Sequence, residues 1–187
     1  MGTSTTPTSL LPFRFEVFLL KIAMIVAMDE DGFIGKGDGL PWSIPSDMSR
    51  FRNLTIGDGF NSVVMGRRTW VSLPDSFRPL PERVNIVMSR DTSWSGEGAE
   101  TALYIGRAIE LAFAEGSDEL WVIGGAEIYS MFLDRVEEIH ITTVRTNDSG
   151  EVSFPSWDKG LWKETVMEVP DSPGDEFPSS YSVWKRV

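Results

Sequence analysis

A carboxylate that follows a tryptophan held between two prolines is the feature of this sequence best suited to chemistry. Residues 40–46 read Leu-Pro-Trp-Ser-Ile-Pro-Ser, and Asp47 comes directly after them. Pro41 and Pro45 each fix their own φ and push the preceding residue towards extended geometry, so we expect a stiff loop. Pro45 suits the first position of a helix, which places Asp47 in the first turn, where a negative charge is favoured.

The helix predicted after Pro45 places Asp47 on a face with apolar residues. At helical spacing, Asp47, Phe51 and Leu54 share one face. A single carboxylate on an otherwise apolar face has its pKa raised, which prepares an acid or a hydrogen-bonding anchor. The alternative is that Asp47 only interacts with the helix dipole or caps the helix.

Composition narrows the function classes. A chain of 187 residues with 41% hydrophobic content predicts one domain with a substantial core. There are no cysteines, which excludes disulfides and thiol chemistry, and no cluster of metal-ligand spacing occurs. The single histidine, His140, lies in a strand-like run, and we do not expect a catalytic histidine with a partner. No apolar stretch is long enough to span a membrane, and the run over residues 17–28 does not resemble a signal peptide, so we expect a cytoplasmic protein.

The charge distribution points to a small anionic ligand. A net charge of −11 argues against nucleic acid or an anionic membrane as partner. Residues 44–90 nevertheless carry seven arginines, no lysine and only four acidic residues, an excess of three positive charges. Arginine favours forked recognition of carboxylate and phosphate groups. Ordinary surface arginines are the alternative.

Strands and helices alternate along most of the chain. We expect residues 1–20 to form a largely disordered N-terminal extension, in which 13–18 could add a short strand, and residues 21–187 to form the domain. Residues 29–44 are predicted to be a long, glycine-containing loop. Alternation followed by strands alone predicts an α/β fold with a mostly parallel sheet and an antiparallel C-terminal edge. The predicted strands are 22–28, 62–65, 84–89, 101–105, 120–123, 138–144, 162–169 and 181–186, and the predicted helices are 46–56, a short one starting at 66–70, 107–115 and 126–133.

Two strand-to-helix turns have the composition of phosphate-binding turns. One is residues 65–69, Met-Gly-Arg-Arg-Thr, and the other contains Gly124 and Gly125. Glycine lets the backbone approach a ligand closely, and free amides at a helix start can hold phosphate. Neither turn matches the G-x-G-x-x-G pattern, and each could be a tight turn without a ligand. Together with Ser89 and Arg90 after a third strand, they indicate a phosphorylated dinucleotide, and the extra cations favour its 2′-phosphate form.

The order and spacing of these motifs resemble dihydrofolate reductase from about Lys21 to Val187. The residues that carry the resemblance are Ile34-Gly35, Leu40-Pro41-Trp42, Pro45 with Asp47, Met65-Gly66-Arg67-Arg68-Thr69-Trp70, Arg78-Pro79-Leu80-Pro81 with Arg83, Asn85 to Arg90, and Ile123-Gly124-Gly125 with Tyr129. The resemblance implies a central sheet of eight strands, mostly parallel, with four helices. It also implies reduction of dihydrofolate by NADPH in a protein that we expect to be monomeric.

The resemblance further implies roles for individual residues. Asp47 would bind the amidine-like edge of the pterin and promote protonation of its imine nitrogen, with Trp42 holding a water and Thr142 contacting the carboxylate. Leu40 would lie in the loop that closes over the nicotinamide. Arg83 would fork onto the α-carboxylate of the glutamate tail, near Arg52. Further substrate contacts would come from Ile25, Ala27, Met48, Phe51, Leu73, Leu80, Ile123 and Tyr129. The cofactor would contact Ala27, Ile34, Gly66, Arg67, Arg68, Thr69, Ser89, Arg90, Gly124, Gly125, Ala126, Glu127, Ile128 and Tyr129.

Two other functions stay open at this point. A folate- or nucleotide-binding protein without catalysis would keep the same binding motifs, although the presence of both Asp47 and Trp42 argues against it. A pterin or pyrimidine reductase of similar fold is the other, and Arg83, matched to the glutamate tail, favours folate instead.

Overall fold

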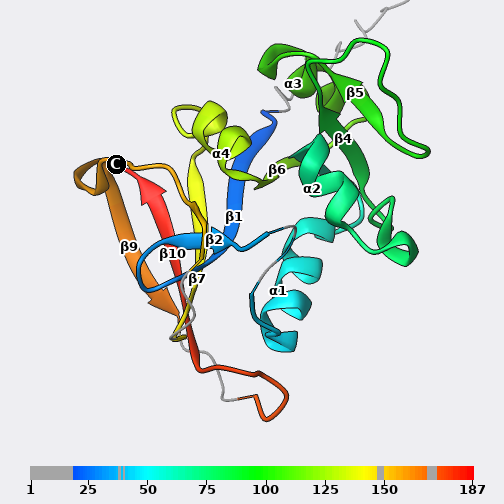
Figure 1. Ribbon diagram of the computed structural model, residues 1–187. Helices are drawn as coiled ribbons and strands as arrows, with labels where there is room; N and C mark the ends of the chain where they lie inside the picture. The colour runs from blue at the N-terminus through cyan, green and yellow to red at the C-terminus, as the bar shows by residue number, and fades with distance from the viewer. Residues whose placement is uncertain (1–18, 38, 40, 147–149, 168–171) are drawn as a thin grey trace, which may run out of the picture.

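The chain forms an α/β domain around one eight-stranded sheet. The computed structural model describes residues 19–37, 39, 41–146, 150–167 and 172–187. The strands of the main sheet, in chain order, are β1 (Lys21–Asp29), β3 (Ser62–Gly66), β4 (Val84–Met88), β5 (Glu100–Ala102), β6 (Glu119–Gly124), β7 (Glu138–Val144), β9 (Trp162–Met167) and β10 (Ser179–Arg186). They lie in the order β5-β4-β3-β6-β1-β7-β10-β9, with β5 and β9 at opposite edges (Figure 1).

The sheet is parallel except at its C-terminal side. Strands β5, β4, β3, β6, β1 and β7 pair in parallel, whereas β10 is antiparallel to both β7 and β9. The central strand β1 reads Lys-Ile-Ala-Met-Ile-Val-Ala-Met-Asp, a nearly continuous apolar run typical of a strand covered on both faces. The predicted mostly parallel sheet of eight strands with an antiparallel edge is therefore confirmed.

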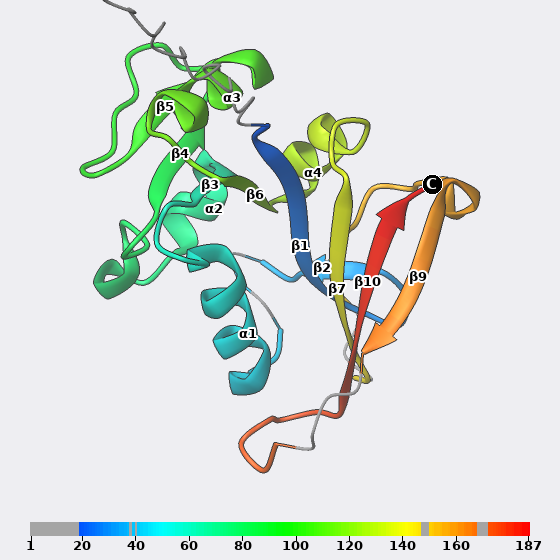
Figure 2. The same cartoon turned by 180° about the vertical axis from the view of Figure 1, so that it is seen from behind.

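In the part of the chain that the structure describes, four α-helices cover the two faces of the sheet (Figures 1 and 2). On one face, residues of α3 (Ile105–Ala114) and α4 (Ala126–Phe132) pack into the larger apolar cluster with alternate residues of β1 such as Met24. On the other face, α1 (Pro45–Ile56) and α2 (Arg67–Ser72) pack with Ile25 and its neighbours. The side-chain alternation of β1 thus separates the two cores, and the predicted number of four helices is confirmed.

A second, two-stranded sheet pairs part of the segment that was predicted to be a loop with a distant strand. Strand β2 (Phe33–Gly35) pairs in antiparallel fashion with β8 (Val152–Ser153). The prediction of a continuous loop over 29–44 is therefore wrong for β2, and it also missed β8. These strands are two and three residues long, too short to show a period of two, and their partners are distant in sequence. Their pairing is a product of the tertiary fold.

Element boundaries differ from the predictions by a few residues. The strand expected at 101–105 is β5 and ends at Ala102, because Ile105 already begins α3. Strand β4 ends at Met88, before Ser89. Two short 3₁₀ helices, η1 (Asp75–Phe77) and η2 (Lys159–Leu161), were not predicted. The possible strand at 13–18 lies outside the described residues, as do the last two residues of the strand predicted at 162–169.

Candidate functional site

Asp47 lies in the first turn of α1 and faces the carboxyl end of β7. Pro45 begins the helix, as predicted, and Asp47 does not cap it, because its carboxylate is bonded elsewhere. Its Oδ1 accepts a hydrogen bond of 2.5 Å from Thr142 Oγ1 and one of 3.0 Å from Arg50 Nη1. No hydrogen bond from the described part of the chain reaches Oδ2. The capping interpretation of Asp47 is therefore excluded, and one carboxylate oxygen remains available to a ligand.

Burial raises the pKa of Asp47 above its ordinary value. The hydrogen bond from Thr142 and the positive charge of Arg50 oppose this effect without cancelling it. The side chain of Asp47 is only 14% exposed. The prediction of a raised pKa is confirmed, but the helix face is not otherwise apolar, since Arg50 also lies on it. A spacing of three residues places both groups on one side of the helix.

The residues predicted to form the apolar slot mostly lie together. Ile25 and Leu80 are buried in the core cluster beneath α1 and α2, and Phe51, Leu73 and Ile123 pack against this cluster with partly exposed side chains. Two predicted members lie apart from it. Ala27 packs against the small cluster of Trp42, Ile44 and Val144, and Met48 is 55% exposed and belongs to none of these clusters.

Arg83 is held firmly at one side of this cluster. Its Nη1 donates to Thr55 Oγ1 at 2.7 Å, its Nε donates to the carbonyl of Pro81 at 2.9 Å, and its guanidinium lies 5.8 Å from the ring of Phe51. Burial and the nearby Arg52 lower the pKa of Arg83. Arg52 itself is exposed and pairs with Glu82 at 3.1 Å. The structure thus places Arg83 against the buried Thr55 and the ring of Phe51, whereas Arg52 lies at the surface.

The two glycine-containing turns lie against one another. A Cβ atom at Gly66 would lie 3.1 Å from the Ile128 side chain and 3.9 Å from the carbonyl of Gly124. Gly124 has a φ of +107°, and a Cβ there would lie 2.9 Å from the ring of Tyr129. Only glycine fits at Gly124, because both its backbone conformation and its packing exclude a side chain.

The glycine-containing turns also contact the central sheet and one another through side chains. The buried Tyr129 donates a hydrogen bond of 2.8 Å from its hydroxyl to the carbonyl of Ile25. A Cβ at Gly125, whose peptide bond with Gly124 is cis, would lie 3.6 Å from Thr69 Oγ1. The turns after β3 and β6 therefore form one continuous surface at the carboxyl ends of the parallel strands, where ligands of open α/β sheets bind.

Cations and carboxylates alternate beside these turns. Arg67 pairs with Asp91 at 3.4 Å, and Arg90 lies 3.9 Å from Glu127, which is in the first turn of α4. These side chains are about half exposed or more. Arg68 is also exposed, whereas Ser89 is buried and its hydroxyl accepts a hydrogen bond from the amide of Asp91. Arg67, Arg68 and Arg90 are all exposed, and Arg67 and Arg90 have carboxylate neighbours that the sequence interpretation did not pair with them. Their role at a phosphate stays a prediction.

The remaining predicted residues are spread around the same edge. Trp42 is buried with Ile44 and Val144, and Ile34 lies in β2 against the larger core. Ala126 begins α4, followed by Glu127 and the buried Ile128. Leu40 lies outside the described residues, so its predicted place in a closing loop stays a prediction. Among the described residues there is no group of three or more acidic, histidine or cysteine side chains arranged to hold a metal ion.

Comparison with known proteins agrees with this arrangement. The sequence model of the dihydrofolate reductase family matches residues 21–186, almost the whole chain after the N-terminal segment. The chain belongs to the dihydrofolate reductase family. It is 41% identical to dihydrofolate reductase from Neisseria meningitidis serogroup A over 146 residues, which are 78% of this chain and 86% of the relative. It is 43% identical to the Mycobacterium leprae enzyme over 125 residues, which are 67% of this chain and 73% of the relative.

A solved structure supports the same family. Dihydrofolate reductase from Enterococcus faecalis, complexed with NADP(H) and RAB-propyl, superimposes with a TM-score of 0.77 at 27% identity. The match covers 89% of this chain and 96% of that one. None of the helices in the described part of the chain has the length and apolarity needed to cross a membrane.

Three residues in the polar contacts that lead from Asp47 to the sheet were not predicted to be part of the site. Arg50 pairs with the carboxylate, and Tyr181 of β10 lies against Arg50, with 4.4 Å from the guanidinium carbon to the ring centre. His140, which was not expected to be a catalytic histidine with a partner, contacts the Tyr181 hydroxyl through Nδ1 at 2.6 Å. The spacing of Asp47 and Arg50 was a usable signal, as was the alternation that puts His140 and Thr142 on one face of β7.

Proposed function

We propose that this chain reduces 7,8-dihydrofolate to 5,6,7,8-tetrahydrofolate with NADPH, and that Asp47 anchors the substrate. The observation that carries the proposal is a nearly buried carboxylate with a raised pKa and a free Oδ2, beside an apolar cluster at the ligand-binding edge of the sheet. Family membership supports the same reaction.

The carboxylate acts on the pterin through its charge and its position. Oδ2 accepts hydrogen bonds from the amidine-like edge of the pterin, while Thr142 and Arg50 hold Oδ1. The negative charge of Asp47 favours arrival of a proton at the imine nitrogen, a step in which positioned acid–base groups typically contribute a factor of about 10² or more. Trp42, in the loop before α1, holds a water near the carboxylate in this proposal.

The apolar side chains exclude water from the rings, and the arginine at their side selects the substrate. Phe51, Leu73, Leu80 and Ile123 surround the pterin and benzoyl rings with Ile25 beneath them. Arg83 binds the α-carboxylate of the glutamate tail, and its bonds to Thr55 and Pro81 keep the guanidinium in place. Arg52 contributes charge from the surface. A rigid cation of this kind distinguishes folate from smaller pterins.

The residues of the two glycine turns fit NADPH. Gly66, Thr69 and residues 124–129 hold the pyrophosphate in this proposal, and the lack of side chains at Gly66, Gly124 and Gly125 lets the backbone come close to it. Arg67, Arg68, Ser89 and Arg90 hold the adenosine 2′-phosphate. When bound, NADPH supplies the hydride. We further propose a cytoplasmic monomer that works in one-carbon metabolism through tetrahydrofolate and is a target for antifolates.

A spectrophotometric assay tests this function. Purified protein should oxidise NADPH only when dihydrofolate is present, and should prefer dihydrofolate over a dihydropterin without the glutamate tail. Binding of both ligands without turnover would identify an inert binding protein. Equal use of the two substrates would favour a general pterin reductase and would remove the proposed role of Arg83.

A further inference from the structure

Arg50 is an unexpected cation beside the carboxylate of the proposed reaction. Its Nη1 lies 3.0 Å from Asp47 Oδ1 and also donates to Thr142 Oγ1 at 3.2 Å, while Thr142 Oγ1 donates to the same Oδ1. The three side chains therefore form a closed set of hydrogen bonds. The Arg50 side chain is only 15% exposed, so its interaction with Asp47 is screened much less than that of a surface pair.

Tyr181 supports the guanidinium from the sheet. The guanidinium carbon of Arg50 lies 4.4 Å from the centre of the Tyr181 ring, a cation–π distance. Tyr181 of β10 pairs in register with Thr142 of β7. The Tyr181 ring and the Thr142 hydroxyl, which both contact Arg50, therefore come from neighbouring strands. Arg50 is thus fixed from two sides by residues that do not belong to its own helix.

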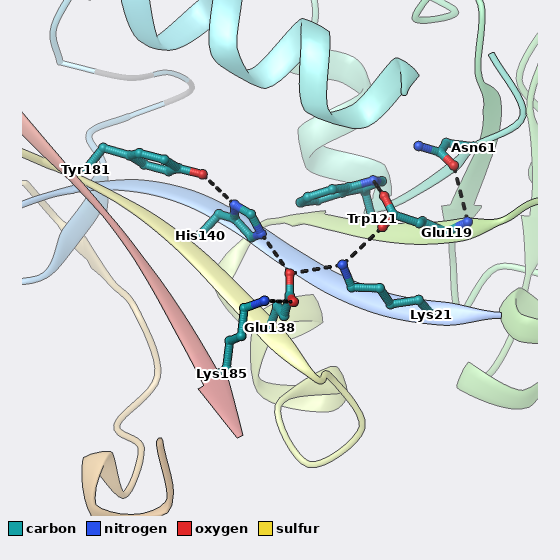
Figure 3. Close-up of polar contacts among 8 residues, drawn as sticks. All are labelled: Lys21, Asn61, Glu119, Trp121, Glu138, His140, Tyr181 and Lys185. Atoms are coloured by element: carbon teal, nitrogen blue, oxygen red, sulfur yellow. Dashed lines mark hydrogen bonds and ion pairs between the residues drawn. The ribbon is translucent and has the colours of Figure 1, made fainter. Parts of the chain in front are cut away.

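A second polar network fixes the Tyr181 hydroxyl (Figure 3). His140 Nδ1 lies 2.6 Å from this hydroxyl, and His140 Nε2 lies 3.3 Å from Glu138 Oε2. Glu138 also pairs with Lys21 at 2.9 Å and with Lys185 at 2.8 Å. An ionised Glu138 only accepts, so the proton of neutral His140 is on Nε2 and Nδ1 accepts from Tyr181. The Tyr181 hydroxyl is therefore bonded to His140, and Arg50 contacts the face of the Tyr181 ring.

The hydrogen bonds to Oδ1 of Asp47 determine the orientation of its other oxygen, Oδ2. Both donors converge on Oδ1, and the carboxylate cannot rotate without breaking the bonds to Arg50 and Thr142. We propose that Arg50 is a positioning residue that keeps Asp47 ionised and holds its Oδ2 ready for the substrate. This role rests on the proposed function, because it concerns the same site, but its effect on Asp47 is measurable without turnover.

Other ionisable groups act on the same carboxylate. Asp175, whose Oδ1 accepts from the amide of Ser46, raises the pKa of Asp47, and the hydroxyls of Tyr129 and Tyr181 are near enough to interact with it. Neither tyrosine is ionised at neutral pH, since burial raises the pKa of both. Arg50 is therefore the cation on which ionisation of Asp47 depends among the described neighbours.

Three variants test Arg50. Arg50→Met removes the charge and keeps an apolar stem, and Arg50→Lys keeps a charge but loses the planar fork. The matched control is Arg107→Met, which breaks the Arg107–Glu110 pair of the same i,i+3 spacing on the exposed surface of α3. The main measurement is the pH titration of the Asp47 carboxyl carbon by NMR in the ligand-free protein, assigned by comparison with Asp47→Asn.

We expect the titration midpoint of Asp47 to rise by about one pH unit in Arg50→Met, the low end of the effect of a nearby opposite charge. In Arg50→Lys it should rise measurably but by less than half as much, and in Arg107→Met it should not move. In kinetics, kcat/KM for dihydrofolate at pH 7 should fall about tenfold in Arg50→Met and recover partly in Arg50→Lys.

Two results would overturn the role of Arg50. One is an unchanged midpoint in Arg50→Met. The other applies if Arg50→Met does not fold, and is a midpoint and kcat/KM of Arg50→Lys equal to those of the wild type. If Arg50→Met shifts the midpoint but the wild-type protein shows no reductase activity, the interaction between Arg50 and Asp47 is supported and the proposed function is rejected. The two failures are therefore distinguishable.

Discussion

Asp47 and Glu138 are two carboxylates with equally exposed side chains and opposite pKa directions. Each side chain is 14% exposed, and each lies beside at least one cation. Burial would raise the pKa of both, and it does raise that of Asp47. In Glu138, burial is outweighed by the bonds from Lys185, Lys21 and His140, and its pKa falls to about 2. Equal exposure of the side chain to solvent therefore does not decide the pKa.

Two features explain the difference: Asp47 is more deeply enclosed by protein than Glu138, and fewer of its oxygens are paired. Lys185 bonds Glu138 Oε1, while Lys21 and His140 contact Oε2, so both oxygens are satisfied within the protein (Figure 3). At Asp47 the donors converge on Oδ1 alone. A carboxylate that is fully paired stabilises the fold, whereas one that is partly paired keeps capacity for a ligand.

The largest effect that tests this contrast is expected from Asp47→Asn. Activity at pH 7 should fall by about 10²-fold or more, because a positioned acid–base group is lost. The deficit should shrink at acidic pH, where solvent protonates the substrate. The measurement is the pH profile of the hydride-transfer rate, with Glu110→Gln on the exposed face of α3 as control. A deficit that does not change with pH would show that Asp47 does not assist protonation.

The same variant should not lose stability. A carboxylate whose pKa is raised on folding destabilises the native state at pH values above that pKa, and the neutral amide removes this cost. The free energy of unfolding of Asp47→Asn at pH 7 should therefore equal or exceed that of the wild type. A clear loss in chemical denaturation would mean that the carboxylate is needed for the fold, and the contrast with Glu138 would fail.

Glu138→Gln should show the opposite behaviour. Because its pKa falls from 4.5 to about 2 on folding, ionised Glu138 stabilises the native state above pH 4.5, and this contribution is lost as the pH falls towards 2. Solvent screening at this partly exposed site reduces the contribution to about 1–2 kcal/mol at pH 7. The difference in unfolding free energy between wild type and variant should shrink from pH 7 to pH 3. A constant difference would assign the loss to packing.

The sequence predicted the parts of the site that depend on local rules. Pro45 at the start of α1, Asp47 in its first turn and the glycine turn at Gly124 follow from backbone geometry, which neighbouring residues determine. The eight-stranded sheet followed from alternating elements and from the resemblance to a known family. What was missed depends on residues far apart in sequence. Arg50 meets Thr142 across 92 positions, and β2 finds its partner β8 only in the folded chain.

His140 shows where local signals were present but insufficient. Glu138, His140 and Thr142 alternate along β7 and so point to one face of the sheet. This pattern indicates a polar line, but not which groups complete it. The answer comes from the register of the neighbouring strands, in which Tyr181 lies beside Thr142 and Lys185 lies beside Glu138. A single sequence does not contain that register.

The smallest effect is expected from Lys185→Met, which tests whether Glu138 depends on several partners. The Lys185 side chain is 64% exposed although its Nζ lies 2.8 Å from Glu138 Oε1, whereas Lys21 is 33% exposed and bridges Glu138 and Glu119. Lys185→Met should lower the free energy of unfolding by about 0.5 kcal/mol at pH 7, which is within the range measured for exposed ion pairs. Lys21→Met should lower it by more.

The acid side of the stability profile sharpens this last prediction. With Lys21 and His140 still bonded to Oε2, the pKa of Glu138 in Lys185→Met should rise but stay below 4.5. The loss of stability in acid should therefore begin near pH 4.5 in both proteins and should end at a higher pH in Lys185→Met than in the wild type, because the folded-state pKa sets where it ends. If Lys185→Met lost as much unfolding free energy as Glu138→Gln, a single exposed lysine would account for the low pKa of Glu138. The full pairing of both oxygens would then not be what separates Glu138 from Asp47.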